Sequence, residues 1–459
     1  MKYLGRKPMK LRNPLLILLA ALSLASHAAD RPNIILIMAD DMGYENLSCH
    51  GSKLNSTPNI DKLAAGGMRF DNAHSQPICT PSRIQIMTGI YNTRNYVRFG
   101  LLDPKETTFG NLLRDAGYET CVAGKWQLGG GYEGPVNFGF DRYCLWQLNR
   151  KPSRYPNPGF EIDGKQVDYK NGEFGPDIVT DYICDFIGEK AKGERPFLVY
   201  YPMMLPHWPF VPTPDSPDWD PEMWKDAKNE PGGYRDQKYW KGFVEYTDKM
   251  VGKVVAKLDE EGIRENTLVI FTCDNGTYTG ISQEFRKRTV QGAKGSTIDD
   301  GTHVPFIANW PGKIAEGKVS DELVDFSDVL PTLIDLGKAT VPGGLSTDGH
   351  SLAPAFLGTP HIPRPAVYCW YERDGIRNKA SEHTRTNRYK LYATGKFFDT
   401  QEDPLQKTDL AAAGIPEELA GIHASLKAAL DLRIAETDIF DPIQSARAKA
   451  LKPDGAGKE

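Results

Sequence analysis

Four oxygen-bearing side chains in this sequence stand in two pairs, Asp40 with Asp41 and Asp274 with Asn275. Each pair follows a short apolar run that is rich in β-branched residues. An acidic pair in such a position is by itself more often a turn or a helix cap than a pair of metal ligands. Two pairs after two separate runs favour a shared metal site, and oxygen donors select a hard cation such as calcium or magnesium over zinc. We therefore predict that these four side chains bind a divalent metal ion.

A second chemical signal is the segment CTPSR at residues 79–83. A lone cysteine is usually a small, buried structural thiol. Here proline follows Cys79 by two residues and Arg83 follows it by four, and this pattern resembles the signature of the type I sulfatases of the alkaline-phosphatase-like superfamily. In that family a formylglycine-generating enzyme oxidises the cysteine to formylglycine (3-oxoalanine). The resemblance implies that Cys79 becomes the nucleophile and that its modified side chain also contacts the metal.

The resemblance extends from Asn33 to about Leu410, nearly the whole mature chain. Ordered motifs spread this widely rarely coincide by chance. The resemblance implies calcium as the metal, with magnesium as the other possibility. The matching segments are TPNID at 57–61, GKW at 124–126, PH at 206–207, DNG at 274–276, KG at 294–295, VP at 304–305, and FD, DP and DL motifs between residues 398 and 410.

The chemistry of the residues agrees with this resemblance. A sulfate monoester is a poor electrophile surrounded by negative oxygens, so its hydrolysis needs a strong nucleophile, charge neutralisation and a proton for the leaving alcohol. A hydrated aldehyde at residue 79 offers a hydroxyl nucleophile and can expel sulfate by re-forming the aldehyde, which a serine could not do. The metal would lower the pKa of the hydrate and polarise a sulfate oxygen. The predicted activity is therefore that of a sulfuric ester hydrolase.

The resemblance also implies roles for four cationic or titratable side chains. Arg83 would hold the aldehyde hydrate, while Lys125 and Lys294 would bind sulfate oxygens as compact positive charges. Lysines are usually solvated surface charges, and only the Gly-Lys-Trp and Lys-Gly motifs distinguish these two. A histidine taken at random is more often a hydrogen-bonded structural residue. His207, however, follows a predicted strand end, and we predict that it protonates the leaving alkoxide as general acid.

Two positions depart from the family pattern. Relatives commonly have a histidine two residues after the first lysine, but this chain has Gln127, which can hydrogen-bond a hydrate hydroxyl and cannot take a proton. We expect Gln127 to contact the substrate and to alter turnover rather than to abolish it. Beyond the Lys294 motif, His303 stands where relatives often have glycines and an arginine. His303 could contact substrate or pack beside the lysine loop, and the sequence leaves both open.

Aromatic residues in the loops suit a saccharide substrate, because the apolar faces of sugars stack on aromatic rings. Trp208, next to the predicted general acid, is the strongest candidate for such a contact, although any loop aromatic can equally pack in a local core. We therefore expect a sulfate ester on a sulfated carbohydrate as substrate. The alternatives are a phosphonate or phosphodiester hydrolase of the same superfamily, and an unmodified relative that only binds sulfated glycans. The other loop aromatics are Trp146, Tyr155, Trp224 and Tyr234.

Three apolar runs are predicted as strands buried on both faces, because they are too short for typical helices. They are Asn33–Met38, Phe197–Tyr201 and Leu268–Thr272. Helical spacing in residues 57–66 and 236–261 predicts an α/β fold with a large, mostly parallel sheet flanked by helices. Sites in such folds form at the carboxyl ends of the strands, where both acidic pairs fall. The Pro- and Gly-rich stretches 149–175 and 211–233 are predicted as long surface loops around the site.

The sequence predicts two domains. Residues 29–363 form the catalytic α/β domain and residues 364–444 a small C-terminal one. In the second, short alternating segments at 366–371, 389–394 and 397–399 precede a helical stretch over 416–436, which predicts a small antiparallel sheet with a helix. The segment 445–459, rich in Lys, Ala and Gly, is predicted to be a flexible tail.

The N-terminus and the composition limit the possible partners. Residues 1–28 combine basic residues, the apolar run Leu15–Ala25 and a small-x-small site, which predicts a signal peptide and a periplasmic or secreted protein. The run is shorter than the roughly 20 residues that span a bilayer, so no stable membrane association is expected. A net charge of −5 with interspersed signs leaves no basic stripe for nucleic acid. The seven cysteines form no CxxC pair, which argues against a structural zinc site.

Overall fold

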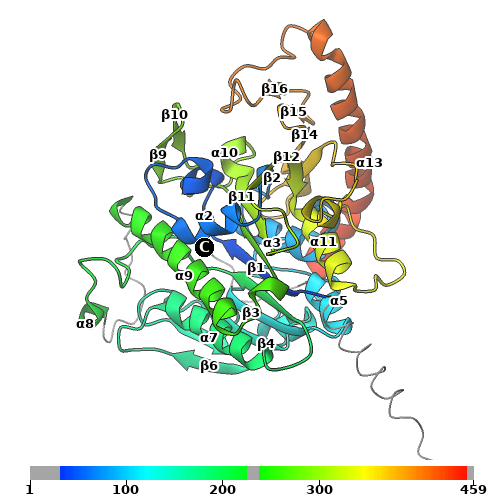
Figure 1. Ribbon diagram of the computed structural model, residues 1–459. Coiled ribbons are helices and arrows are strands. Elements are labelled where there is room, and N and C mark those ends of the chain that lie inside the picture. The colour runs from blue at the N-terminus through cyan, green and yellow to red at the C-terminus, as the bar shows by residue number, and fades with distance from the viewer. Residues whose placement is uncertain (1–30, 225–236, 452–459) are drawn as a thin grey trace, which may run out of the picture.

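A computed structural model of the chain describes residues 31–224 and 237–451. Its centre is a ten-stranded mixed sheet in the order β12-β2-β11-β8-β1-β7-β3-β4-β5-β6 (Figure 1). The consecutive strands β8, β1, β7, β3 and β4 are parallel, whereas β11 and β5 run antiparallel to both of their neighbours. The strands are β1 (Asn33–Ala39), β2 (Met68–His74), β3 (Glu119–Lys125), β4 (Arg142–Trp146), β5 (Gly159–Ile162), β6 (Lys165–Asp168), β7 (Phe197–Pro202), β8 (Thr267–Cys273), β11 (His303–Asn309) and β12 (Lys318–Asp325).

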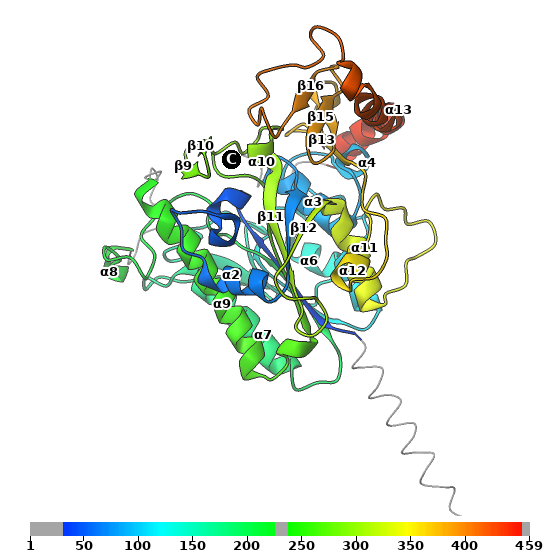
Figure 2. The same ribbon diagram turned by 45° about the horizontal axis from the view of Figure 1, so that its top comes forward.

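Helices cover both faces of this sheet. Helices α2 and α7 each contact α9 on one face, and α3, α5 and α11 contact one another on the other (Figures 1 and 2). Every residue of β1, β7 and β8 is buried, as expected for central strands that are covered on both faces. The helices of this domain are α2 (Pro58–Ala65), α3 (Cys79–Thr88), α4 (Asn92–Asn95), α5 (Phe109–Asp115), α6 (Gly134–Asn137), α7 (Gly175–Lys190), α8 (Pro221–Trp224), α9 (Trp240–Glu260), α10 (Asp299–Thr302), α11 (Val329–Gly337) and α12 (Ala353–Phe356).

The predicted α/β class and the three predicted strands are confirmed. The prediction of an unbroken surface loop over 149–175 is wrong, because β5 and β6 form a hairpin within it that extends the sheet. Asp163 and Gly164 join these strands, and both have positive φ, as a two-residue hairpin turn requires. The Asp-Gly pair was the sequence signal for this turn. The predicted loop 211–233 contains α8, and its residues from 225 lie outside the described ranges.

The C-terminal region forms the predicted small antiparallel sheet with a helix. The strands are β13 (Val367–Tyr371), β14 (Ser381–Arg385), β15 (Tyr389–Tyr392) and β16 (Phe397–Asp399), of which β14 had not been predicted. Helix α13 (Ala420–Ala450) packs against β14 and β15 and continues six residues into the segment that was predicted as a tail. A separate hairpin, β9 (Ser282–Phe285) and β10 (Arg288–Gln291), lies at the upper left of the molecule in Figure 1.

Single-turn 3-10 helices complete the fold. They span Tyr44–Asn46, Ser48–His50, Gly131–Glu133, Gln237–Tyr239, Arg264–Asn266, Phe326–Asp328, Arg377–Lys379 and Glu417–Leu419. Among the described residues, no helix combines the length and apolarity needed to cross a bilayer. The predicted signal peptide, residues 1–28, lies outside the described ranges.

Candidate active site

The two acidic pairs lie side by side at the carboxyl ends of β1 and β8. These strands are parallel neighbours, and their register aligns Ala39 with Cys273. The residues that follow the two strands therefore lie next to each other at the same edge of the sheet. The backbone N–H of Asp41 donates to Asp274 Oδ1 at 3.1 Å, and Asn275 Nδ2 donates to Asp41 Oδ1 at 2.9 Å. The sequence-based expectation that parallel strand ends bring the two pairs together is therefore confirmed.

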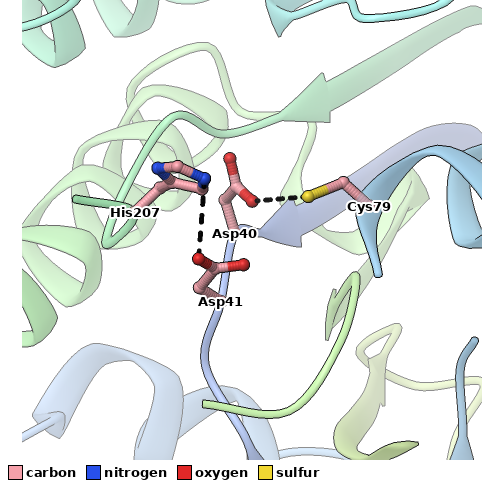
Figure 3. Close-up of side chains that lie close together, drawn as sticks. All are labelled: Asp40, Asp41, Cys79 and His207. Carbon is pink, nitrogen blue, oxygen red and sulfur yellow. Dashed lines mark hydrogen bonds and ion pairs between the residues drawn. The ribbon is translucent and has the colours of Figure 1, made fainter. Parts of the chain in front are cut away.

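Cys79 is the first residue of α3 and is fully buried beside the acidic pairs. Its Sγ lies 3.6 Å from Asp40 Oδ1 and 3.4 Å from Lys125 Nζ. Figure 3 shows Cys79, Asp40, Asp41 and His207 pointing toward one another from three separate segments, because Asp40 and Asp41 are adjacent residues. One ligand atom from each of these four residues lies within 4.8 Å of the others. The predicted nucleophile thus faces the predicted metal ligands.

Arg83 and Lys125 neutralise these carboxylates. Arg83, one turn after Cys79 on α3, places Nη2 3.0 Å from Asp274 Oδ2 and 3.8 Å from Asp40 Oδ2. Its Nη1 donates to the carbonyl oxygen of Lys125 at 2.9 Å, which fixes the end of β3. Lys125 Nζ in turn lies 2.9 Å from Asp40 Oδ2. Both cations are buried, so their charges act on the carboxylates with little screening by water.

Lys294 and His207 complete the cluster around Asp41. Lys294 Nζ lies 2.8 Å from the Asp41 carboxylate and 3.2 Å from His207 Nε2, and His207 Nε2 lies 3.6 Å from Asp41 Oδ2. The backbone N–H of Gly295 donates to the carbonyl oxygen of Pro77 at 2.7 Å. This bond ties the lysine loop to the segment that leads into Cys79.

Arg154 is a site residue that sequence reasoning missed. Its Nη1 lies 2.9 Å from His207 Nδ1, and its guanidinium covers the ring of Trp146 at 3.9 Å. Trp208 O lies 2.6 Å from the same His207 nitrogen. Arg154 falls inside the stretch predicted as a surface loop, and no motif distinguishes it from the other arginines. The residue is nevertheless buried.

Burial and charge set the protonation of the cluster. Burial raises the pKa of Asp274 to about 7 and also raises that of Asp41, because a dry site disfavours the charged form. Burial opposes ionisation of Asp40 as well, but Lys125 and its cationic neighbours outweigh it and hold the pKa of Asp40 below its usual range. Burial raises the pKa of the Cys79 thiol well above its usual value. An unmodified thiol here is protonated and is therefore a weak nucleophile.

The donor set fits a hard divalent cation. Asp40, Asp41, Asp274 and Asn275 present only oxygen atoms on the ligand side, and a bound cation would offset the cost of ionising the buried carboxylates. Asn275 Oδ1 is buried and has no hydrogen bond from the described parts of the chain, so this oxygen remains available to a metal. The three carboxylates and the three cations that contact them cancel in formal charge, and Arg154 adds one positive charge beside His207. A divalent ion would thus leave a net positive site suited to an anionic ester.

The three residues predicted to bind substrate differ in position. Gln127 follows Lys125 closely, is buried, and has a φ of 58°. Trp208 is half-buried, and its ring stacks beside that of His207 with centroids 5.6 Å apart. His303 instead stacks on Tyr44 at 3.8 Å, and its Nε2 lies 2.8 Å from the carbonyl oxygen of Asp71. His303 therefore belongs to a neighbouring group of residues.

A buried nucleophile position and an oxygen-lined cation site at the strand ends, with three flanking cations, suit the hydrolysis of anionic esters. The sulfatase family model matches residues 32–339, which is more than half of the chain, and a model described as N-sulphoglucosamine sulphohydrolase, C-terminal, matches residues 293–434. The chain belongs to the sulfatase family and is a sulfuric ester hydrolase.

Curated relatives share most of this chain. It is 32% identical to arylsulfatase A of Homo sapiens over 84% of this chain and 80% of that protein. It is 30% identical to N-acetylgalactosamine-6-sulfatase of Canis lupus familiaris over 84% of this chain and 78% of that protein. Among solved structures, Ps i-CgsB in complex with k-i-k-neocarrahexaose is similar with a TM-score of 0.74 and 27% identity, covering 90% of this chain and 94% of that one.

Proposed function

We propose that this sulfatase hydrolyses a sulfate monoester on a sulfated carbohydrate, using formylglycine made from Cys79 together with a calcium ion. The observation that carries the proposal is the position of Cys79 Sγ, between the Asp40 carboxylate and the Lys125 ammonium. The carbohydrate is supported by relatives named for sulfated sugars, such as N-acetylgalactosamine-6-sulfatase. A solved relative with a carrahexaose bound supports the same class of substrate.

Asp40, Asp41, Asp274 and Asn275 would hold the calcium ion, next to the modified side chain of residue 79. When bound, the ion would supply a charge that polarises a sulfate oxygen and lowers the pKa of a neighbouring hydroxyl. Magnesium has the same preference for oxygen but demands a stricter octahedral geometry, so a cluster of buried carboxylates suits calcium better. The formylglycine would supply a hydroxyl nucleophile that releases sulfate without attack of water on sulfur.

The chain's own cations position the sulfate group. Lys125 Nζ lies 3.4 Å from Sγ of Cys79 and also contacts Asp40, so it can bind an oxygen of a sulfate placed on residue 79. Lys294 occupies the corresponding place beside Asp41 and His207. Asp274 and the carbonyl oxygen of Lys125 hold Arg83 in place. Arg83 therefore orients the modified side chain of residue 79 from a fixed position. These three cations neutralise charge that grows as the ester bond breaks.

His207 is the proposed proton donor to the leaving alcohol. Its Nε2 faces Lys294 and Asp41, while its Nδ1 faces Trp208 O. The proton would therefore leave from Nε2, the ring nitrogen on the side of the cluster. Burial, with Lys294 as the next contributor, lowers the pKa of His207 well below its usual value, so the neutral ring is favoured in the free site and the imidazolium, once formed, is a strong acid.

Two measurements test this proposal. The intact mass of the peptide that carries residue 79 should show the decrease expected when the –CH2SH side chain becomes –CHO, which replaces sulfur by oxygen and removes two hydrogens. The purified enzyme should then hydrolyse 4-methylumbelliferyl sulfate faster than bis(4-nitrophenyl) phosphate. The Cys79→Ala variant should hydrolyse neither substrate above background. An unmodified mass, or a faster rate on the phosphodiester, would contradict the proposal and favour one of the alternatives from the sequence.

We also propose that the protein is exported to the periplasm or the medium. The support is the order of basic residues, apolar run and small-residue site over residues 1–28. Fractionation of cells that express the full chain tests this. Recovery of an uncleaved protein in the cytoplasm would contradict export.

A further inference from the structure

A cavity of about 560 Å³ lies between the β9–β10 hairpin and the C-terminal sheet, outside the cluster around Cys79. This volume is within the usual range for sites that bind small ligands. In Figure 2 the hairpin and the C-terminal strands stand on the same side of the large sheet. The side chains that matter for its chemistry are Tyr44, Phe285, Arg286, Lys287, His303 and Arg385.

The cavity shares a sheet edge with the active site. His303 begins β11 and pairs with His74 at the end of β2, five residues before Cys79. Tyr44, which stacks on His303, stands three residues after Asp41. Both walls of the cavity are thus continuous in sequence with segments of the active site. One extended ligand could reach both places from the same face.

The lining carries excess positive charge in a chain whose net charge is −5. Four of the lining residues are Arg or Lys and two are Asp, which leaves +2 with histidines neutral. Both lining acids have other cations in contact. Asp299 is held by Lys390 at 2.8 Å as well as by Arg385, and Asp71 is held by Arg69 at 2.8 Å. These two carboxylates therefore do not neutralise the basic residues of the β9–β10 hairpin.

Arg286 and Lys287 supply the available charge. Both are exposed at the turn of the hairpin, and neither has a carboxylate partner among the described residues. The next cation of the hairpin, Arg288, forms a bidentate pair with Asp300. Its charge is therefore already neutralised within the protein. Exposed basic residues are often merely solvated. Here, however, the two cations flank an aromatic wall in which Phe285 and Tyr44 lie 5.3 Å apart.

We propose that this cavity is a second anion-binding subsite, which holds a sulfate or carboxylate group on another unit of the same polyanionic saccharide. The proposal rests on the sulfated-carbohydrate substrate given above. Arg286 and Lys287 bind the anionic oxygens, because guanidinium and ammonium groups form charge-assisted hydrogen bonds with them. Asn72 and Asn387 also line the cavity; their Nδ2 atoms donate to the carbonyl oxygen of Asp321 at 2.8 and 2.6 Å, and their Oδ1 atoms accept from hydroxyl groups of the sugar.

The subsite distinguishes a long substrate from a small one. A sulfate ester on a single aromatic ring engages only the cluster around Cys79 and gains nothing from the hairpin. An oligosaccharide with several sulfate groups gains the contacts to Arg286 and Lys287. Removing these two side chains should therefore weaken only the binding of the oligosaccharide.

The test uses a chondroitin sulfate hexasaccharide and calorimetry on full-length protein that carries Cys79→Ala, so that no turnover occurs. Adding Arg286→Ala and Lys287→Ala should raise the Kd of the hexasaccharide about tenfold, as expected for two exposed charge pairs. Lys165→Ala with Lys170→Ala, two exposed lysines at the β6 side of the sheet, is the matched control and should leave the Kd unchanged. The desulfated hexasaccharide keeps its carboxylates and distinguishes the two anions: a higher Kd in the hairpin variant than in the parent would assign the subsite to a carboxylate, and an unchanged Kd would assign it to a sulfate.

The catalytic arm uses protein with an intact Cys79 and 4-methylumbelliferyl sulfate. Here the hairpin double variant should keep the kcat and KM of the parent. Equal Kd values for parent and hairpin variant, or no binding of the hexasaccharide to the parent, would overturn the second subsite. Failure of the parent to hydrolyse the aryl sulfate would instead overturn the proposed function, so the two failures are distinguishable.

Discussion

The ammonium group of Lys390 lies 2.8 Å from the carboxylate of Asp299, so a strand of the small C-terminal sheet is bonded to the loop that follows Lys294. Lys390 is fully buried, and its Nζ also donates to the carbonyl oxygen of Thr297 at 2.9 Å. The hydroxyl of Tyr392, two residues further on, lies 3.2 Å from Thr297 Oγ1. The C-terminal sheet thus fixes the loop from which Lys294 reaches the cluster.

Lys390→Met should weaken both stability and catalysis. Loss of one partner of a buried ion pair typically costs about 3 kcal/mol, and Arg385 remains to compensate part of this. We expect a lower midpoint of urea unfolding and a lower kcat on aryl sulfate under conditions where the variant is still folded. Lys396→Met, an exposed position in the following turn, is the control. A destabilised variant with unchanged kcat would show that the bond does not position Lys294.

Calcium should stabilise the folded protein and restore activity after chelation. A ligand present at one hundred times its Kd stabilises by about 2.7 kcal/mol, which is measurable as an increase in Tm. Asp40→Asn should lose most of this increase, because it removes a buried anionic ligand. The exposed Asp321→Asn should behave like the parent. An equal calcium response in Asp40→Asn would remove this carboxylate from the metal site.

Lys294→Ala should lower kcat/KM on aryl sulfate by more than about 100-fold, in line with the loss of one buried electrostatic contact to the reacting group. The residue contacts both Asp41 and His207, so its removal also takes away the cation beside His207 Nε2, while Arg154 stays beside Nδ1. Initial rates over a range of substrate concentrations measure the effect. The exposed Lys313→Ala is the matched control, and a loss below fivefold for Lys294→Ala would argue against direct contact with sulfate.

Glu45 should make the wild-type protein less stable as the pH rises from 5 to 8. Burial raises the pKa of Glu45 from 4.5 to about 7. A raised folded-state pKa means that the stabilising contribution of the protonated acid is complete below 4.5 and is lost as the pH passes through 7. The loss is on the order of 3 kcal/mol, since one pKa unit equals about 1.4 kcal/mol.

Glu45→Gln should remove this dependence, because a neutral amide can still contact Asn46 and Thr277. Urea unfolding at pH 5 and pH 8 measures it, and the difference in unfolding free energy between variant and wild type should grow with pH. The exposed Glu316→Gln should follow the wild type at both values. A constant difference between Glu45→Gln and wild type across this range would refute the prediction.

Gln127→His should change the release of sulfate in single-turnover experiments. Glutamine cannot accept a proton, whereas a histidine two residues after Lys125 could act as a base toward the sulfated nucleophile. We expect faster sulfate release in the variant, with binding of the aryl sulfate little changed. An unchanged release rate would remove residue 127 from the rate-limiting chemistry.

Much of the site could be predicted from the sequence, because its parts are short contiguous motifs attached to recognisable elements. The acidic pairs follow runs that could only be buried strands, and parallel strands bring their carboxyl ends to one edge. The pattern around Cys79 and Arg83 needs only one turn of helix to place both side chains in the cluster. Local sequence was therefore sufficient to select the candidate nucleophile, the four candidate oxygen ligands and the cations that the fold brings together.

Other features were decided only by the tertiary structure. The contact of Arg154 with His207 joins residues 53 positions apart, and the contact of Lys390 with Asp299 joins residues 91 apart. No pattern within one segment encodes such distances, because they follow from how the hairpin β5–β6 and the C-terminal sheet pack against the large sheet. The same packing places His303 in the second cavity. The positions of these side chains are set by long-range packing and strand register, which depend on the whole core.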